Sequence, residues 1–210
     1  MTRKDHILAV AAQLFAERGY NNVGMDDLGA AIGVTGPALY YYFKGKAQLL
    51  TELLLPSSRE LAENAIAIVE TSDSGLDALA GLVREHVSFV VQHPSLAIVH
   101  AHELRHLSKS EQAQVRTTMR GYVSTWAAVV DGVSPDLDLA EARALVQGVF
   151  AMINGMPLEH LSATGHDVAS FITTLMVATL EAFVTGLAPL TVPPPATEVT
   201  GGGHGVVTPR

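Results

Sequence analysis

The chain has 210 residues, of which 48% are hydrophobic and 16% are charged, and its formal net charge is −8. This composition excludes an intrinsically disordered chain, and the length suffices for one helical body with a small additional unit. The absence of cysteine excludes disulfide frameworks, cysteine nucleophiles and thiolate metal sites, and it is compatible with a reducing cytoplasm.

Charge is distributed unevenly along the chain. Residues 1–50 carry five basic and four acidic side chains, a balance of +1, which leaves −9 for the remainder. An N-terminal unit of this kind can approach nucleic acid although the whole chain is acidic.

Apolar residues at helical spacing, beginning with Ile7 and Ala11, predict an amphipathic helix over residues 3–18 that ends at Gly19.

The stretch over residues 25–46 predicts two short helices that cross through a tight turn. Leu28 and Ile32 share one face of a first helix over residues 25–32, and Gly33 supplies the left-handed residue that ends it. Val34 then packs into the corner between the two helices.

The second helix of this pair begins at Gly36, and Thr35 is placed to accept hydrogen bonds from its free amides. Leu39 and Phe43, four residues apart, face the first helix. The other side chains point outward or lie at the edges: Thr35, Gly36, Ala38, Tyr40, Tyr41, Tyr42 and Lys46. Small residues followed by phenolic hydroxyls and a lysine suit the DNA major groove, which predicts a DNA-binding helix.

The segment GVTGPALYYYFKGKAQLL, residues 33–50, resembles the signature of the TetR family of transcriptional repressors. The resemblance implies an all-α homodimer that binds double-stranded operator DNA and a small hydrophobic effector, with no cofactor. It implies a three-helix DNA-binding head over residues 1–46 and a ligand-binding and dimerisation domain over residues 47–190. Pro and Gly predict a flexible tail over residues 191–210.

The same resemblance implies roles for individual residues of the head. The residues implied to face base edges are Gly36, Pro37 and Ala38. The residues implied to contact the DNA backbone or bases are Tyr40, Tyr41 and Tyr42. Lys46 is implied to contact a phosphate, and Thr35 to cap the helix and donate a hydrogen bond to a phosphate. Asp26 stands where some members of the family carry a basic residue that reads bases.

Apolar periodicity predicts six helices after the head, over residues 46–70, 76–92, 94–107, 109–131, 138–160 and 167–187. Pro56 is expected to kink or divide the first of them. The last two carry no charge between Ala144 and Leu158 or between Val168 and Leu180, which is typical of buried or interfacial helices. Threonines and Glu181 argue against a membrane span, and the TetR resemblance implies a four-helix dimer bundle instead.

An effector pocket is expected among the body helices. Candidate lining residues are Phe89, Met119, Tyr122, Trp126, Phe150 and Asn154. Pockets and cores draw on the same residue types, so lining and core filling both remain open. Arg116 and Arg120 precede Tyr122 and Trp126 on one predicted helix, an arrangement that suits an anionic hydrophobic ligand such as an acyl-coenzyme A thioester.

His102, Glu103 and His106 form the pattern H-E-x-x-H, in which a helix presents two imidazoles and a carboxylate for zinc hydrolysis. No third-ligand motif follows, so a zinc hydrolase is the alternative, and a regulator without catalytic residues is the main prediction. The histidines His93, His100, His102 and His106 allow a regulatory metal site, a pH-sensitive wall or, more simply, polar helix-face residues near a domain junction. A helical binding protein that merely retains a head-like motif is a third possibility.

Overall fold

The computed structural model describes residues 2–134, 136–156, 158 and 167–186, and every regular element among them is helical. The all-α prediction is therefore confirmed. The elements are α1 (Arg3–Arg18), η1 (Tyr20–Asn22), α2 (Met25–Ile32), α3 (Gly36–Leu39), α4 (Lys46–Thr71), α5 (Gly75–Gln92), α6 (Pro94–His102), η2 (Leu104–His106), α7 (Lys109–Val133), α8 (Leu139–Asn154) and α10 (Val168–Val184). The predicted tail over residues 191–210 lies outside the described residues.

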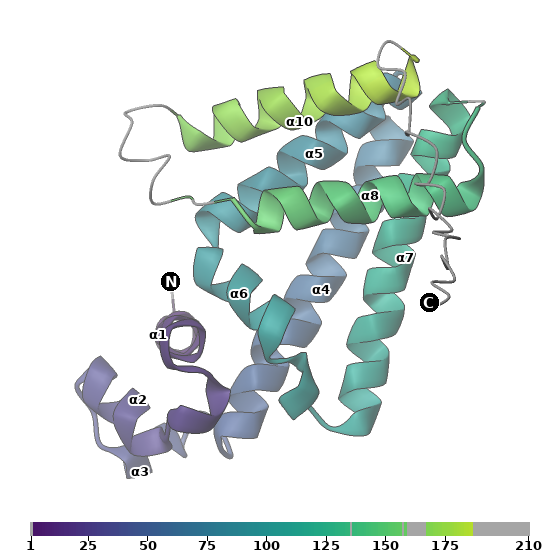
Figure 1. Ribbon diagram of the computed structural model, residues 1–210. Coiled ribbons are helices and arrows are strands. Elements are labelled where there is room, and N and C mark those ends of the chain that lie inside the picture. Colours follow the sequence, from purple (N-terminus) through teal and green to yellow (C-terminus); the bar gives the residue numbers. More distant parts are fainter. Residues whose placement is uncertain (1, 135, 157, 159–166, 187–210) are drawn as a thin grey trace, which may run out of the picture.

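Helix α1 has the bounds that the sequence predicts. Thr2 and Asp5 form a reciprocal capping box at its start, and Gly19, at φ 78°, ends it. Its buried face, which includes Ile7, Ala11 and Phe15, packs with α2, α3 and the first turns of α4. We call α1–α3 the head, and Figure 1 shows it at one end of the molecule.

Helix α4 connects the head to the remainder of the chain, which we call the body (Figure 1). Of the two expectations for Pro56, a kink or a division of the helix, the division does not occur, because α4 continues through the proline in a helix of 26 residues. The hydroxyls of Ser57 and Ser58 donate to the carbonyls of Leu53 and Leu54 in the turn around the proline. Pro56 lacks the amide that would bond to the carbonyl of Glu52, and the serine hydroxyls bond to the next two carbonyls of the same turn.

Two hydrophobic clusters hold the structure together. The body cluster contains buried residues of α4, α5, α7, α8 and α10, among them the fully buried Trp126. The head cluster also includes three residues from outside the head: Val99 of α6, Leu107 between η2 and α7, and Val115 of α7. The head is therefore packed against the body through apolar side chains, and α6 and α7 are part of that contact.

Helices α8 and α10 lie at the end of the body opposite α2 and α3 (Figure 1). Each buries a stripe at helical spacing, for example Val146, Val149 and Ile153 in α8 and Ile172 and Met176 in α10. Their other faces reach the surface although they carry few charges. Helix α8 ends at Asn154, earlier than the predicted residue 160, and residues 159–166 are outside the part of the chain that the structure describes.

Candidate functional site

The turn between α2 and α3 depends on the absence of side chains at two glycines. Gly33 adopts the left-handed conformation, φ 76° and ψ 32°, as predicted. A Cβ atom on Gly29 would lie 2.8 Å from the carbonyl oxygen of Val34, and one on Gly36 would lie 2.0 Å from Oδ1 of Asp26. The two helices can thus cross at backbone distance, and Gly36 is buried in the crossing.

Helix α3 is shorter than the sequence suggests, since its α-helical part ends at Leu39. The amides of Tyr40, Tyr41 and Tyr42 bond to carbonyls three residues earlier at 3.3, 3.4 and 2.9 Å, which continues the chain as a tighter turn. Three tyrosines have modest helix propensity, and so short a helix is marginal. The turn still directs Phe43 into the head cluster.

The predicted DNA-contacting residues differ in exposure. Thr35, Pro37 and Ala38 are exposed together with all three tyrosines, and Tyr41 has 87% of its surface accessible. The predicted side-chain cap from Thr35 is wrong, because its hydroxyl makes no capping bond and its carbonyl accepts from Ala38 N–H at 2.9 Å. Pro37 removes one of the two amides that such a hydroxyl would serve, which leaves the hydroxyl free for another partner.

Lys46 lies at the start of α4, as predicted, but it is half-buried. Its Nζ donates a 2.7 Å hydrogen bond to the carbonyl of Tyr20 and lies 4.2 Å from the centre of the Tyr20 ring. This cation–π contact and hydrogen bond connect α4 to η1. Lys46 therefore joins two parts of the structure beside the predicted DNA-contacting surface.

A cavity of about 190 Å³ lies between five helices of the body and η2, and we call it the inner pocket. Its lining residues are Leu61, His86, Phe89, Ala97, His100, Ala101, Leu104, Val115, Met119 and Asn154. Of the predicted pocket residues, Phe89, Met119 and Asn154 lie here. The wall is mostly apolar with a few polar groups, which is the usual character of a small-molecule site.

His86 is the most notable polar group of the inner pocket. It is 4% exposed, and burial lowers its pKa to about 4, so the imidazole is neutral at pH 7. The Tyr122 hydroxyl lies 3.2 Å from Nδ1, and burial raises the pKa of that hydroxyl, so it stays protonated and can donate to Nδ1. The imidazole proton then resides on Nε2, which meets no acceptor at full hydrogen-bond geometry among the described residues. A weaker interaction with the Asn154 side chain raises the pKa of His86 and partly offsets the effect of burial.

Tyr122, Trp126 and Phe150, which the sequence also suggests as pocket residues, form an aromatic cluster behind His86. The Phe150 ring stacks on His86 with centroids 4.4 Å apart and on Tyr122 at 5.3 Å, and it meets Trp126 edge-on at 4.9 Å. Tyr122 and Trp126 are fully buried. These three side chains fix the position of His86, and they do not line the inner pocket.

His100 is the second imidazole of the inner pocket, and its residue is partly exposed. Burial lowers its pKa to about 4, and its Nε2 lies 2.7 Å from the Ser57 hydroxyl. Because that hydroxyl donates to the carbonyl of Leu53, it accepts from His100. The sequence analysis included His100 only in the histidine group from His93 to His106, not as a pocket residue, and it missed His86. A signal was available for His86, since it continues the apolar stripe of Leu79, Leu82 and Val83 at helical spacing.

The zinc-hydrolase alternative is not supported. Helix α6 ends at His102, and His106 belongs to the separate turn η2, so the predicted single helix over residues 94–107 is wrong. Glu103 faces the head, where its Oε1 accepts from Tyr20 N–H at 3.3 Å, and His106 stacks on the Tyr20 ring at 4.8 Å. Among the described residues, no three His, Asp or Glu side chains are grouped as metal ligands.

The histidines are therefore divided among different environments. His93 and His102 are exposed, His100 lines the inner pocket, and His106 contacts the head.

None of the helices in the described part of the chain combines the length and the hydrophobicity that a membrane span needs.

Comparisons with known proteins agree with this architecture. Residues 7–53 match the model of bacterial regulatory proteins of the tetR family, and residues 72–158 match that of the tetracyclin repressor-like C-terminal domain. The transcriptional repressor KstR2 of Mycolicibacterium smegmatis is 28% identical over 145 residues, which cover 66% of this chain and 71% of that protein.

Solved structures show the same fold. The ketosteroid transcriptional regulator KstR2 of Mycobacterium tuberculosis aligns with a TM-score of 0.74 at 21% identity, over 87% of this chain and 95% of that chain. FadR of Bacillus subtilis, in complex with stearoyl-CoA, aligns with a TM-score of 0.65 at 21% identity, over 88% of this chain and 99% of that chain. With both the head and the body matched, the chain belongs to the TetR family of transcriptional regulators.

Proposed function

We propose that this protein is a homodimeric repressor that binds double-stranded operator DNA and releases it when a small hydrophobic effector enters the body. It acts in the cytoplasm as a regulator and not as an enzyme. The observation that carries the proposal is the position of the inner pocket. Its wall includes three residues of α6, and α6 packs directly on α1 of the head.

Two elements connect the inner pocket with the head. Glu103, directly after α6, accepts the hydrogen bond from Tyr20, and α4 extends from Leu61 in the pocket wall to Lys46 beneath the same tyrosine. An effector that displaces α6 or α4 therefore changes the orientation of the head. It shifts the equilibrium only by its differential affinity for the two states, and a coupling of about 1–3 kcal/mol is ordinary.

On the DNA side, we propose that Pro37 and Ala38 approach base edges and that Thr35 and the three tyrosines contact bases or phosphates. Gly36 permits this geometry by its small size, because it is buried against Asp26. Two heads in a dimer would enter successive major grooves, which repeat at about 34 Å. Lys46 contributes positive charge near the phosphates and holds Tyr20.

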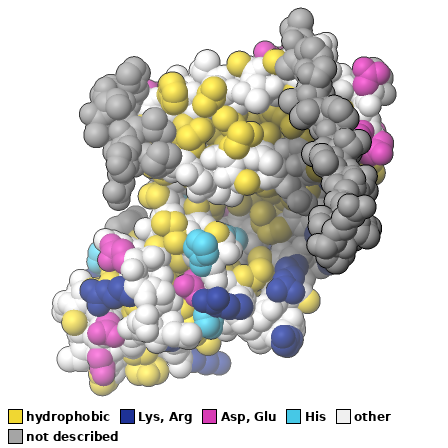
Figure 2. Space-filling view, in the orientation of Figure 1, with side chains coloured by type: hydrophobic (Ala, Val, Ile, Leu, Met, Phe, Trp, Pro, Cys, Tyr) yellow, Lys and Arg dark blue, Asp and Glu magenta, His cyan; other side chains and the backbone are white. Residues whose placement is uncertain are grey.

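We propose that dimers form through α8 and α10. Leu139, Met152 and Leu175 expose 43, 43 and 41% of their surfaces on these two helices. Figure 2 shows hydrophobic side chains gathered over them. Small exposed residues of α8, such as Ala144 and Gly148, allow close helix approach. An apolar surface of this kind marks an interaction site.

The dimer proposal can be tested with matched substitutions. Leu175→Asp should convert the protein to a monomer in light scattering, because a charge would enter an apolar interface. Ile66→Asp is the control, since Ile66 is 48% exposed on α4, a helix outside the proposed interface pair. Equal dimer stability in both variants would contradict the assignment of α8 and α10.

We also propose the division of the chain into a head over residues 1–46 and a body that begins with α4. The first turns of α4 supply Leu49, Leu50 and Leu54 to the head cluster. The head should therefore move together with the start of α4. Limited proteolysis that released residues 1–46 as a folded fragment would contradict this attachment.

The chemistry of the inner pocket supports an effector that is apolar but carries a hydrogen-bond acceptor. A neutral His86 would present its Nε2–H to the pocket, where Asn154 interacts with the imidazole but no protein acceptor reaches full hydrogen-bond geometry, and a ligand carbonyl would satisfy it. An acyl-coenzyme A thioester has such a carbonyl beside an apolar chain. The stearoyl-CoA in the FadR structure adds support for this class of effector.

The function is tested by selection of duplexes from a random DNA pool, followed by anisotropy titration of the selected sequence. We expect a palindromic site of two half-sites and a loss of affinity when an acyl-coenzyme A is added. Failure to enrich any sequence would favour a helical binding protein that only retains a head-like motif. Enrichment without any effector response would contradict ligand-controlled release.

A further inference from the structure

We infer that the effector carries a phosphorylated head group with several negative charges, which binds in a groove between α7 and α8 while its apolar part passes Met119 into the inner pocket. This inference rests on the proposed effector site. It adds a second, anion-binding compartment and a route between the two compartments.

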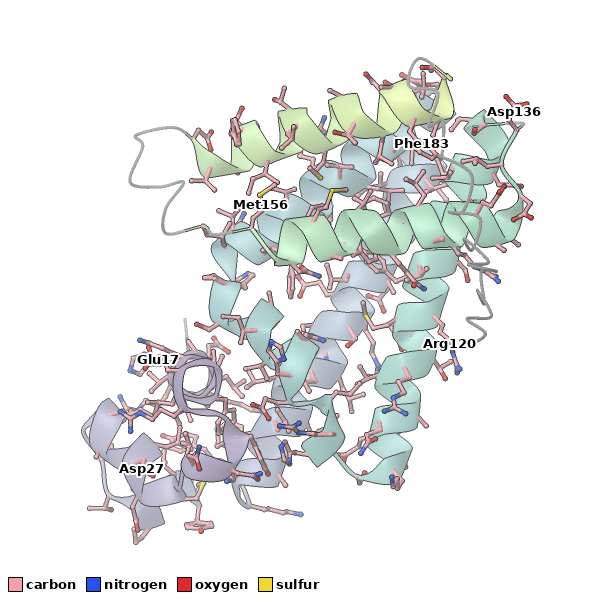
Figure 3. The ribbon with its side chains drawn as sticks, in the orientation of Figure 1. Glu17, Asp27, Arg120, Asp136, Met156 and Phe183 are labelled. Atoms are coloured by element: carbon pink, nitrogen blue, oxygen red, sulfur yellow. The ribbon has the colours of Figure 1, made fainter. Side chains whose placement is uncertain are left out.

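The groove has a volume of about 570 Å³, and we call it the arginine groove. Helix α7 contributes Arg116, Met119, Arg120, Val123 and Ser124 to its lining, and α8 contributes Arg143 and Gln147. The described lining thus combines three guanidinium groups, two uncharged polar groups and an apolar floor, with no carboxylate. Figure 3 shows Arg120 projecting outward from α7, and Figure 2 shows Lys and Arg side chains on this side of the molecule.

Such a concentration of positive charge is unusual in this body. The chain after residue 50 has a net charge of −9. Between residues 47 and 186 its basic residues are Arg59, Arg84, Arg105, Lys109, Arg116, Arg120 and Arg143. Three of these seven residues line one groove, although the body offers many carboxylates that could have paired with them.

The three arginines are also available for a ligand. Arg120 donates to the Thr117 hydroxyl at 3.1 Å, and within the described residues none of the three forms an ion pair. Arg116 and Arg120 lie four residues apart on α7, a spacing at which like charges destabilise a helix. A bound polyanion would remove this repulsion, and guanidinium groups bind phosphate oxygens in pairs of hydrogen bonds.

Met119 belongs to both compartments, since it lines the arginine groove and the inner pocket. It also packs against both the body and the head clusters while remaining partly exposed. A methionine side chain is unbranched and has several rotatable bonds, so it can change conformation at small cost. Rotation of this one side chain would connect the groove with the pocket.

The volumes favour joint use of the two compartments. The inner pocket alone, at about 190 Å³, is smaller than the roughly 300–1,000 Å³ typical of ligand sites. The arginine groove alone is large enough but open to solvent on a face with three charges. A ligand with its carbonyl near His86 and its head group among the arginines would match both environments.

The charge count distinguishes a phosphorylated ester from a free fatty acid. A single carboxylate can engage one guanidinium in a bidentate pair, whereas a diphosphate with a further phosphate can engage all three. Coenzyme A esters have this head-group chemistry. We therefore expect the arginines to discriminate between an acyl-coenzyme A and the acid of the same chain length.

Calorimetric titration of the full-length dimer tests this expectation with octanoyl-coenzyme A, octanoate and coenzyme A. Arg120→Gln and Arg143→Gln should each weaken octanoyl-coenzyme A binding roughly tenfold, because each removes hydrogen bonds to a charged partner. Both should leave octanoate binding unchanged. Arg84→Gln, an exposed arginine on α5 outside the groove, is the matched control and should have no effect.

Met119→Trp tests the route between the compartments. It should weaken octanoyl-coenzyme A binding while leaving the weaker binding of coenzyme A unchanged, since only the ester must pass position 119. Met119→Leu keeps a flexible apolar side chain of similar size and should behave as the parent, and melting temperatures verify that both variants are folded. An equal loss with both probes would contradict passage at Met119.

Several results would overturn the inference. They are equal affinity for octanoyl-coenzyme A and octanoate, unchanged ester binding in both arginine variants, or no binding of any coenzyme A compound. Operator binding without ligand is measured on the same samples. If operator binding is intact while the arginine variants bind the ester normally, the head-group site is wrong and the repressor proposal stands. If the parent chain binds no operator, the proposed function fails instead.

Discussion

The carboxylate of Glu103 accepts a 3.3 Å hydrogen bond from the backbone N–H of Tyr20, which lies 83 residues earlier in the chain. Glu103 directly follows α6, and His106 stacks on the Tyr20 ring from the same turn. The ammonium group of Lys46 also lies 4.2 Å from the centre of that ring. Tyr20 is therefore the residue at which α6, α4 and the head meet.

Loss of the Glu103 carboxylate should uncouple the effector from DNA binding. In Glu103→Ala, we expect the effector-induced loss of operator affinity to shrink several-fold, because the partly buried amide of Tyr20 loses its acceptor from the body. The measurement is operator anisotropy with and without saturating octanoyl-coenzyme A. Glu63→Ala, an exposed position on α4, is the control. Full coupling in Glu103→Ala would show that α6 does not act through this bond.

The exposed phenol of Tyr41 should contribute to operator binding and little to folding. Tyr41→Ala is expected to weaken operator binding about tenfold or more, and Tyr41→Phe by less, because the latter removes only the hydroxyl hydrogen bond. Melting temperatures should stay close to that of the parent, since 87% of the side chain is accessible. Unchanged operator affinity in both variants would remove Tyr41 from the interface.

Lys46 should have two effects that can be separated. Lys46→Ala is expected to weaken operator binding almost uniformly across sequences and to reduce the salt slope by about one per subunit, if the ammonium group lies near a phosphate. It should also lower the melting temperature, because the hydrogen bond and cation–π contact with Tyr20 are lost. A lower melting temperature with an unchanged salt slope would assign Lys46 a purely structural role.

The crossing of α2 and α3 should not tolerate a side chain at Gly29. Gly29→Ala places a methyl group 2.8 Å from the backbone carbonyl oxygen of Val34, and we expect a destabilisation of about 1–3 kcal/mol together with weaker operator binding. Gly121→Ala is the matched control, because a Cβ there meets no atom within 4 Å. In the middle of α7 it should stabilise the protein by up to about 1 kcal/mol. Equal stability of the two variants in urea would contradict the close approach.

The buried histidines should make the protein less stable in mild acid. The pKa values of His86 and His100 are lowered to about 4, so between about pH 6.5 and pH 4 the unfolded chain binds protons that the folded chain does not. The free energy of unfolding should therefore rise with pH through this window, by at most roughly 3 kcal/mol per histidine. It should be nearly level above pH 7.

Urea unfolding at closely spaced pH values checks this prediction. Asp5 and Glu111 also have lowered pKa values, and their contribution is lost below the usual range of carboxyl groups, so the interval from pH 6.5 to 5 reports on the histidines. His86→Phe should reduce the slope there. His102→Phe, an exposed histidine, should leave it unchanged. An unaltered slope in His86→Phe would mean that the imidazole is not desolvated.

Much of the fold follows from the sequence, because local physical chemistry determines it. Ile7 and Phe15 at helical spacing, and Gly19 and Gly33 where positive φ is needed, were sufficient for α1, α2 and their ends. The segment from Gly33 to Lys46 was also sufficient to identify the family. Each of these features depends on residues that lie within a few positions of one another.

Only the tertiary structure decided which side chains meet. The H-E-x-x-H pattern does not form a zinc site, because α6 ends at His102 and Glu103 accepts a hydrogen bond from Tyr20. Lys46 also contacts Tyr20, which the sequence did not indicate. His86 and His100 line one pocket, whereas Trp126 and Phe150 pack behind His86 and do not line it. Arg143 of α8 lines the same groove as Arg116 and Arg120 of α7. Such contacts depend on the relative positions of helices, which apolar packing over the whole chain determines and no local pattern encodes.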